Sequence, residues 1–233
     1  NKKQHSLAME AARKVIPEVF EELAELTGRR YPVMDCYRMD DAEAAVVLLN
    51  SAAETAKEVA DRLREKGEKV GVLSLNVLRP FPTEMVREAL RNVKAIVVGD
   101  RADSYGADGG NLSLELRAAL QIDPDNHTRV LTRIYGLGGK DFDDSDAEEF
   151  FADALETART GEVKEVFAYH GTFAGDPELK VPHGLPAIER GEVSRGMATV
   201  TEDRDSGKLN VELKPLWAMA EVPSRIAPGH GAC

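Results

Sequence analysis

Two glycine-rich loops carry the side chains in this sequence that could hold a small anion. The first follows an apolar run and contains Asp100, Arg101 and Gly106. The second, Gly136-Leu137-Gly138-Gly139-Lys140, also follows an apolar run. Glycine lets the backbone approach a phosphate closely, and open α/β sheets bind ligands beyond the carboxyl ends of their strands. These loops make the following residues the candidates for cofactor binding: Asp100, Arg101, Gly106, Gly136, Gly138, Gly139 and Lys140.

A structural role explains the same residues and is favoured. The second loop lacks the full GxGxxG spacing and the P-loop pattern, so a tight strand-to-helix turn accounts for it. An Asp–Arg pair after a strand can simply hold its own loop. The acidic run 141–149 would repel phosphate and suits the start of a helix, with Asp143, Asp144 or Ser145 as its cap. A helix that begins at Asn111 could still accept an anion at its amino end.

The thiol of Cys233 ends a glycine-rich segment that could deliver a ligand to an inorganic centre. One cysteine cannot hold such a centre, because iron–sulfur clusters and structural zinc sites take about four protein ligands. The five histidines are scattered and form neither an HExxH nor a zinc-finger pattern. A GxSxG elbow is also missing from the sequence. We therefore predict no catalytic residue and no complete metal site within this sequence.

The composition narrows the class of protein. Of the 233 residues 42% are hydrophobic and 30% are charged, which is typical of a folded globular chain. The formal net charge of −11 argues against binding to nucleic acid or to an anionic membrane. Only two cysteines occur, so a reducing, cytoplasmic location is expected.

The pattern of apolar residues predicts an α/β fold with a three-layer, open, mostly parallel sheet. An amphipathic helix is expected over 7–26, broken near Val15 and Ile16 by Pro17. Strands and helices then alternate with short connections, which implies parallel strands and right-handed crossovers. The expected strands are 33–38, 44–49, 69–75, 93–98 and 129–135. The expected helices are 52–66, 84–91 with Thr83 as cap, 111–120 and 145–160.

Changes in composition divide the chain into four parts. Residues 1–30 are an N-terminal helical connector, and 31–162 form the α/β domain. Residues 163–196 are rich in glycine and proline and are expected to be a linker. Met197 begins a segment that looks like a fresh polypeptide, so 197–233 is taken as a separate segment, truncated at its end. The region beyond the domain is expected to be an irregular C-terminal arm.

Several motifs in order resemble the 2-oxoacid:ferredoxin oxidoreductases. They are Tyr37-Arg38-Met39-Asp40-Asp41-Ala42-Glu43, Leu63-Arg64-Glu65-Lys66-Gly67-Glu68-Lys69-Val70-Gly71, Leu78-Arg79-Pro80-Phe81-Pro82 and Asp100-Arg101 with Gly106. Thr27–Tyr31 and Tyr135–Asp141 extend the match, which covers about 10–160. The resemblance implies the α-subunit domain with the fold of the transketolase C-terminal domain, and the pyruvate-type enzyme is preferred.

A second resemblance lies in the tail. Pro228-Gly229-His230-Gly231-Ala232-Cys233 is similar to the opening of the family's β subunit, where a CxxC pair begins the [4Fe–4S] ligands. This resemblance makes Cys233 the first ligand of an incomplete set, and 197–233 the start of a β-subunit-like segment.

The resemblance implies oxidative decarboxylation of a 2-oxoacid to acyl-CoA with electrons passed to ferredoxin. Thiamine diphosphate, Mg²⁺ and [4Fe–4S] clusters would belong to the complete enzyme, and none is expected on this chain alone. The implied partners are the pyrimidine-binding, thiamine diphosphate-binding and γ-type domains, ferredoxin and coenzyme A. Two alternatives stay open: a non-catalytic α/β module that binds an anionic nucleotide or coenzyme A, and a transketolase or 2-oxoacid dehydrogenase C-terminal domain.

Overall fold

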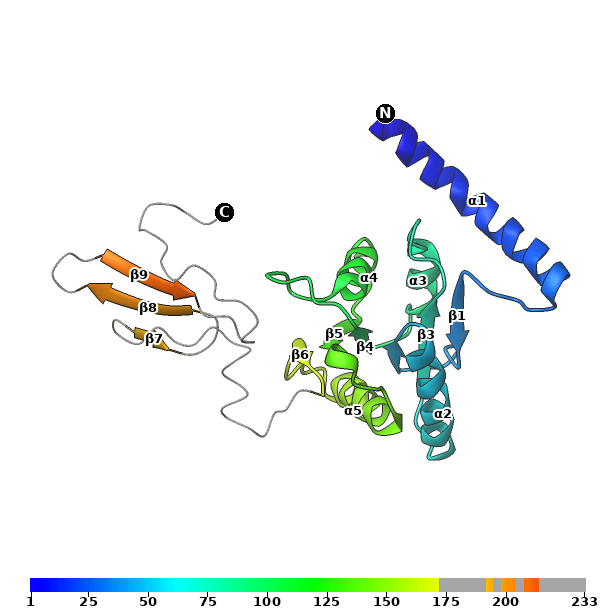
Figure 1. Ribbon diagram of the computed structural model, residues 1–233. Helices are drawn as coiled ribbons and strands as arrows, with labels where there is room; N and C mark the ends of the chain where they lie inside the picture. The colour runs from blue at the N-terminus through cyan, green and yellow to red at the C-terminus, as the bar shows by residue number, and fades with distance from the viewer. Residues whose placement is uncertain (172–191, 195–197, 204–207, 214–233) are drawn as a thin grey trace. The chain divides into compact units, whose positions relative to one another are not determined.

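The computed structural model describes residues 1–171, 192–194, 198–203 and 208–213. The chain forms two compact units, Asn1–Gly171 and Thr172–Cys233. The first unit holds an N-terminal helix and a six-stranded sheet with helices on both faces (Figure 1). The candidate loops of the sequence all lie in this first unit.

Six strands form the sheet, in the order β1-β3-β2-β4-β5-β6. Strands β2 to β6 run parallel, whereas β1 pairs antiparallel with β3 and places Met34 opposite Leu75. The predicted mostly parallel sheet is confirmed. In chain order the strands are Met34–Tyr37, Ala44–Val47, Val70–Leu75, Ala95–Asp100, Arg129–Ile134 and Phe167–Tyr169.

Helices cover both faces of the sheet, as a three-layer fold requires. Helices α2 (Ser51–Glu65) and α5 (Asp144–Thr160) pack on one face, and α3 (Thr83–Ala89) and α4 (Asn111–Gln121) on the other. Adjacent side chains of a strand point to opposite faces. Val46 therefore joins the cluster under α2 and α5, while Val47 joins the cluster under α3 and α4. This two-sided burial explains why the strands read as continuous apolar runs.

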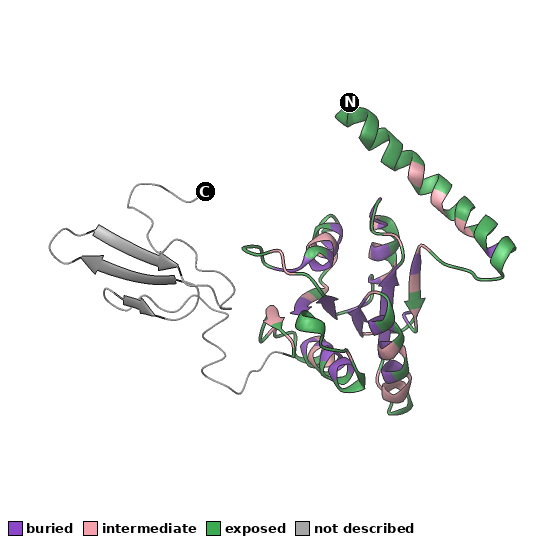
Figure 2. Ribbon diagram, in the orientation of Figure 1, coloured by how far each residue is buried: buried purple, intermediate pink, exposed green. Residues whose placement is uncertain are grey.

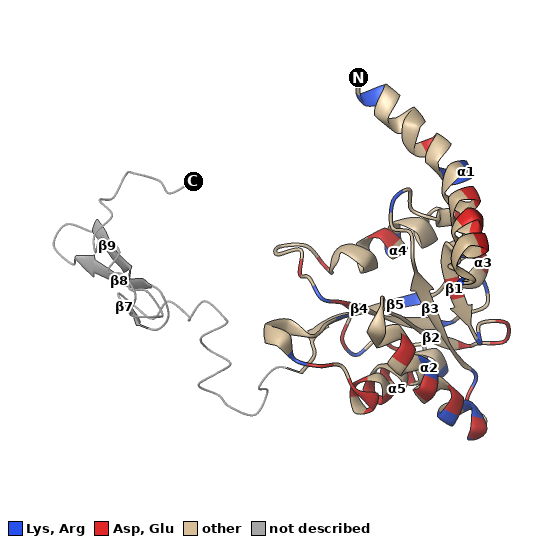
Figure 3. Ribbon diagram, turned by 45° about the vertical axis from the view of Figure 1, so that its right-hand side comes forward, with Lys and Arg blue, Asp and Glu red and all other residues tan. Residues whose placement is uncertain are grey.

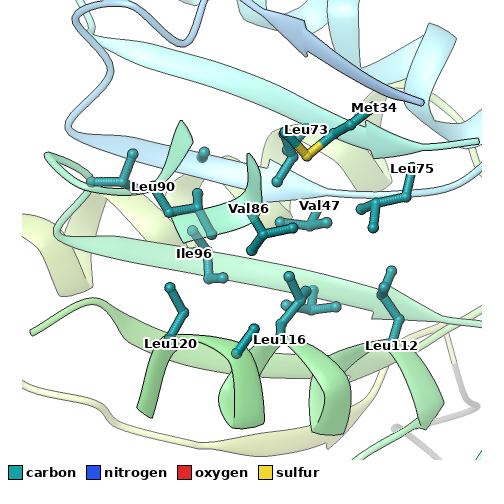
Figure 4. Close-up of a cluster of buried hydrophobic side chains, with 14 of the residues drawn as sticks. Met34, Val47, Leu73, Leu75, Val86, Leu90, Ile96, Leu112, Leu116 and Leu120 are labelled. Atoms are coloured by element: carbon teal, nitrogen blue, oxygen red, sulfur yellow. The ribbon is translucent and has the colours of Figure 1, made fainter. Parts of the chain in front are cut away.

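The core is filled mainly by aliphatic side chains. On the α3/α4 face Val86, Leu90 and Leu116 pack over Val47 and Ile96, and all five are fully buried (Figures 2 and 4). On the other face Phe150 and Phe151 of α5 are fully buried. Burying a side chain of this size stabilises the fold by about 1.5–3 kcal/mol, so these two clusters hold the loops in place.

One crossover connection between parallel strands has the opposite hand to the crossover before it. The crossovers β4–α4–β5 and β5–α5–β6 step the same way along the sheet, but α4 and α5 lie on opposite faces. The two crossovers therefore have opposite hands, so the prediction of uniformly right-handed connections is wrong for one of them. The physical reason is packing: α5 buries its apolar side against α2, β2 and β4, away from the short strand β6.

The N-terminal helix is longer than predicted and unbroken. Helix α1 spans Lys2–Thr27 with Pro17 inside it and ends at Gly28 in a left-handed conformation. The expected break at Pro17 is wrong. A proline removes one backbone hydrogen bond of a helix without ending it here, and the residues of α1 that are not exposed recur every four positions on both sides of Pro17: Ala12, Ile16, Phe20 and Ala24.

Two predicted helix starts have different outcomes. The residue before α3 is Pro82, and Thr83 is its first helical residue, so the prediction of Thr83 as cap is wrong. At α5 the Asp143 side chain accepts hydrogen bonds from the Ser145 and Asp146 N–H groups. In return the Asp143 N–H donates to the Asp146 carboxylate, which completes a capping box. Of the three caps that the sequence allowed, Asp143, Asp144 and Ser145, the structure has Asp143.

The domain boundary expected at residue 162 falls too early. Strand β6 (Phe167–Tyr169) pairs with β5, and His170 N–H donates to the Ile134 carbonyl. The compact unit therefore ends at Gly171. Three-residue β6 was missed because its run is too short to stand out from the expected linker.

The second unit contains an antiparallel sheet of order β7-β8-β9. Its strands are Glu192–Ser194, Ala198–Asp203 and Lys208–Leu213. The description of the arm as irregular is therefore wrong for these strands. Met197, Cys233 and most of the expected linker lie outside the described residues.

Candidate functional site

The carboxyl ends of the parallel strands are the place where an open α/β sheet offers a site. Strand β2 lies between β3 and β4. From β2 the chain steps outward to β3 on one side, and from β4 it steps outward to β5 and β6 on the other side. The crevice expected from this topology lies beyond the ends of β2 and β4. Asp100 ends β4, and the loop after it contributes Arg101.

The carboxylate of Asp100 forms its hydrogen bonds within the chain itself. Its carboxylate is buried and accepts hydrogen bonds from the N–H of Leu112 at 2.9 Å and of Ser113 at 3.1 Å. These N–H groups belong to the first turn of α4, which would otherwise lack partners. A Cβ atom on Gly110 would collide with the Asp100 side chain, so glycine is required there. The amino end of α4, predicted as an anion site, thus already holds the carboxylate of Asp100.

The loop 101–110 is fixed at several points along its length. Arg117 donates to the carbonyl of Asp108 and, at 3.0 Å, to the hydroxyl of Thr132. Partial burial lowers the pKa of Arg117 despite nearby Asp108 and Asp100. Tyr169 donates its hydroxyl to Asp103, which raises the pKa of Tyr169 to about 12. The glycines of this loop therefore lie in a turn that hydrogen bonds hold in place.

The second loop approaches the first through Arg101. The guanidinium lies 5.4 Å from the centroid of the Tyr135 ring, and its Nε is 3.0 Å from where a Cβ on Gly136 would stand. Gly136, Gly138 and Gly139 all have positive φ, between 65° and 82°. Burial raises the pKa of Tyr135, and its contact with Arg101 opposes that rise. Of the predicted site residues, Arg101 and Gly136 are therefore brought together.

Lys140 turns away from this pair toward the start of α5. Its Nζ lies 2.8 Å from Oδ1 of Asp146, and Nε2 of His170 lies 2.6 Å from the same oxygen. Burial alone would raise the pKa of Asp146. The bonds from Lys140, the Asp143 N–H and His170 outweigh that effect, and the net pKa is lowered. Gly171 packs on Lys140, with a Cβ there only 2.6 Å from its Cδ.

This polar cluster of Lys140, Asp146 and His170 was missed by sequence reasoning. His170 looked isolated, and Asp146 was read only as an acidic residue near a helix start. The three come together because His170, the residue after β6, reaches Asp146 in the first turn of α5. Asn50, which follows β2, was missed as well. It has φ 55° and ψ −137°, a conformation that favours glycine, at the crevice predicted by the topology.

The motifs that carried the resemblance form structural contacts. The guanidinium of Arg64 bonds the carbonyls of Val70 and Arg38 and the carboxylate of Asp41, each at 2.7 Å. One side chain thus joins the motif at 37–43 to the motif at 63–71. In the third motif Arg79 pairs with Glu115 at 2.5 Å.

A hollow of about 310 Å³ lies at the amino ends of β2, β3 and β4, opposite the candidate loops. Its charged side chains are paired, with Glu43 between Lys69 and Lys94 and with Glu68 beside Arg159. Across the residues that the structure describes, no group of three or more His, Cys, Asp or Glu is placed to hold a metal ion. Within the same residues, no helix is long and apolar enough to cross a membrane.

Comparison with known proteins decides the resemblance. Residues 42–147 match the family model described as pyruvate:ferredoxin oxidoreductase core domain II. The family resemblance is confirmed. The chain is 39% identical over 155 residues to pyruvate synthase subunit PorA of Thermotoga maritima, covering 66% of this chain and 39% of PorA. It is 37% identical over 167 residues to ketoisovalerate oxidoreductase subunit VorA of Pyrococcus abyssi, covering 70% and 41%.

The chain therefore spans about two fifths of the length of these curated relatives. Among solved structures, a split gene transketolase gives a TM-score of 0.43 at 16% identity, covering 55% of this chain and 45% of that one. A 2-oxoglutarate:ferredoxin oxidoreductase from Magnetococcus marinus gives 0.40 at 18% identity, covering 55% and 20%.

Proposed function

We propose that this chain is part of a 2-oxoacid:ferredoxin oxidoreductase of the pyruvate type. The complete enzyme would decarboxylate a 2-oxoacid oxidatively, form acyl-CoA and pass electrons to ferredoxin. The observation that carries this proposal is the 39% identity with a pyruvate synthase subunit over 155 residues. The residues matched by the family model, 42–147, all lie in the first compact unit.

Within that enzyme, this domain acts mainly as a scaffold and interface. The polar groups at the carboxyl ends of its strands are used internally: Asp100 binds the start of α4, and Lys140 binds Asp146. A catalytic carboxylate or amine must be free to meet substrate or cofactor. This internal pairing supports a domain that is not catalytic alone and that positions other parts of the enzyme.

The cofactors are proposed to lie outside the described residues. Thiamine diphosphate with Mg²⁺ would supply the decarboxylation chemistry, and [4Fe–4S] clusters the electron transfer, in the complete enzyme. Cys233, outside the described residues, stays the proposed first cluster ligand of an incomplete set. The proposed partners are the pyrimidine-binding, thiamine diphosphate-binding and γ-type parts, together with ferredoxin and coenzyme A. We also propose a cytoplasmic location.

Purification of the chain with its natural partners tests this function. An affinity tag on the chain, expressed in its source cells, should recover an assembly that reduces ferredoxin only when a 2-oxoacid and coenzyme A are both present. The chain purified alone should show no such activity. An assembly that lacks 2-oxoacid-dependent reduction would contradict the proposal. Comparison of kcat/KM for pyruvate and 2-oxoisovalerate tests the substrate, and we expect pyruvate to be preferred.

A second candidate is a non-catalytic module that binds an anionic nucleotide or coenzyme A. The observation that favours it is Arg101, whose guanidinium lies beside Gly136 and has no carboxylate partner among the described residues. Gly106, Gly138 and Gly139 would shape the same loops. Calorimetry of the isolated chain with coenzyme A and ADP, against an Arg101→Gln control, separates the candidates. Tight binding that Arg101→Gln abolishes would favour the module.

A further inference from the structure

Helix α1 carries apolar residues at the spacing by which one helix packs along another. From Met9 to Leu26 they follow one another at intervals of three, four, three, four and three residues. This is the period of about 3.5 residues that is typical of a helix in a coiled coil. We call this row, which is about 26 Å long, the α1 seam. Its members are Met9, Ala12, Ile16, Val19, Leu23 and Leu26.

The described part of the chain covers the α1 seam only in part. Ala12 and Ile16 are half-buried, whereas Met9 is 39% exposed, Val19 50% and Leu26 85% (Figure 2). Exposure therefore rises toward the second half of the helix. Contiguous exposed apolar residues are typical of a surface that meets a partner.

Helix α1 meets its own domain on a different side. Arg13 donates to the carbonyl of Phe81 at 2.9 Å, and Ala24 is buried. Arg13 and Ala24 are eleven residues apart, which is about three helical turns, so they share one side of the helix. The α1 seam lies about a quarter of a turn away from that side. The contact with the domain therefore leaves the seam open to a second helix.

Two glutamates of α1 are paired within the chain. Glu10 lies 3.2 Å from Arg13, and Glu21 lies 2.5 Å from Arg30. Glu10 and Glu21 are also about three turns apart, so both pairs lie on one side of the helix, away from the α1 seam. These pairs therefore have no part in binding at the seam.

The other three glutamates of α1 border the seam. They are Glu18, Glu22 and Glu25, in the second half of the helix (Figure 3). Their spacings of four and three place them in one row, which Lys14 begins. Within the described residues, none of the three glutamates has an ion-pair partner. An apolar seam bordered by such carboxylates favours a partner that sets Lys or Arg beside its own apolar residues.

We propose that the α1 seam binds a basic amphipathic helix of a partner chain. The apolar residues of the partner helix, at the same period, pack on Val19 and Leu26. Its cations meet Glu18, Glu22 and Glu25. A second copy of α1 does not offer this chemistry, because the same three carboxylates border its own seam. This binding is a property of α1 and does not depend on the enzymatic role proposed above.

Two designed peptides test the charge of the partner. Both are helical and about three heptads long, with leucine at the two seam positions of each heptad. One has Lys at the flanking positions and the other has Glu. We expect the full chain to bind the basic peptide at least about tenfold more tightly than the acidic one, as measured by fluorescence anisotropy. Equal binding of the two peptides, or no binding of the basic peptide, would overturn the proposal.

Val19→Asp tests the apolar part of the surface. Although it adds a negative charge, it should weaken binding of the basic peptide at least about tenfold, because a carboxylate replaces an apolar contact. Val166→Asp is the matched control: it is the same substitution at 50% exposure outside α1, and it should not weaken binding. Unchanged binding by Val19→Asp would show that only the overall charge attracts the peptide, and the proposal would fail.

Glu22→Lys tests the acidic edge of the seam. It should weaken binding of the basic peptide and strengthen binding of the acidic one. Glu58→Lys, on α2, is the matched control because Glu58 is also exposed and the substitution changes the net charge equally. Equal effects of the two substitutions would count against a specific edge on α1.

Sedimentation equilibrium of the full chain without peptide tests the choice of partner. We expect Val19→Asp to leave the mass of the chain unchanged. A mass of two copies that Val19→Asp reduces to one would show that a second copy occupies the α1 seam, and would overturn the proposed partner. Circular dichroism of each variant checks that the fold is retained.

Discussion

The loops at the carboxyl ends of the strands and the helix α1 use their side chains in opposite ways. In the loops, residues that looked available for a ligand are bonded within the chain, as Asp100 is to the start of α4. In α1, residues that looked like an ordinary buried face are exposed, as Val19 is. The comparison teaches that polar residues in a loop can serve the fold, while an apolar pattern on a helix can stay exposed in the described part of the chain.

The largest expected effect is at Asp100. Replacing it by Ala removes two hydrogen bonds and leaves two N–H groups of α4 without their buried acceptor. We expect the free energy of unfolding to fall by about 2–4 kcal/mol. Urea unfolding measures this loss, and Asp100→Asn, which keeps one acceptor oxygen, should lose less. Unchanged stability of Asp100→Ala would mean that the carboxylate is not structural.

A smaller loss is expected at Gly110. An added Cβ meets the Asp100 side chain, so Gly110→Ala forces that carboxylate away from α4 at a cost of about 1–3 kcal/mol. Gly106→Ala is the control because a Cβ there meets nothing within 4 Å, and it carries only the strain of φ +82°. Thermal unfolding of the two variants should rank them in that order. Equal losses would show that backbone strain, not the approach to Asp100, decides the stability.

Lowering the pH should reveal how much Asp146 contributes to the stability of the fold. Its pKa is lowered in the folded chain, so its stabilisation is present above the unfolded pKa and is lost as the pH falls through the folded value. The window therefore lies below the ordinary aspartate value of 3.8. Asp146→Asn should cost about 1–2 kcal/mol at neutral pH and flatten the fall in stability below this value. If both proteins lose stability in parallel down to the lowest pH, Asp146 makes no such contribution.

The smallest effect on the folded monomer is expected on α1. Val19→Asp should change the unfolding free energy of the dilute chain by less than about 0.5 kcal/mol, because Val19 is half exposed. Ala24→Asp, at a buried position of the same helix, should cost more. Chemical unfolding of the two variants provides the comparison. A large loss at Val19 would mean that this side chain packs inside the fold.

Local patterns predicted the elements of the sheet well, because each depends on residues close in sequence. The run at 44–49 predicts β2, and the acidic run with Asp143, Asp144 or Ser145 as its cap predicts the start of α5. Patterns also misled where distant contacts decide the outcome. Pro17 predicts a break in α1, yet the helix runs unbroken from Lys2 to Thr27.

The candidate site shows the same limit. The sequence indicated Asp100, Arg101 and the glycines of both loops as candidate ligand-binding residues that follow strands. It could not indicate which of them already had partners, because Asp100 meets Ser113 and Lys140 meets Asp146 only after the helices pack. His170 joins Asp146 across a separation of 24 residues, through a strand too short to recognise.

By itself, the sequence determined the class of fold, the family resemblance and the order of the motifs. The reason is that the spacing of apolar residues, the turn residues and the local motifs all depend on residues close in sequence. Only the tertiary structure decided the antiparallel edge strand β1, the reversed hand of the α5 crossover and the internal partner of Asp100. It also decided that Val15, Val19 and Leu26 of α1 stay exposed. The reason is physical: periodicity says that a side chain needs a partner, and only packing in space assigns which one.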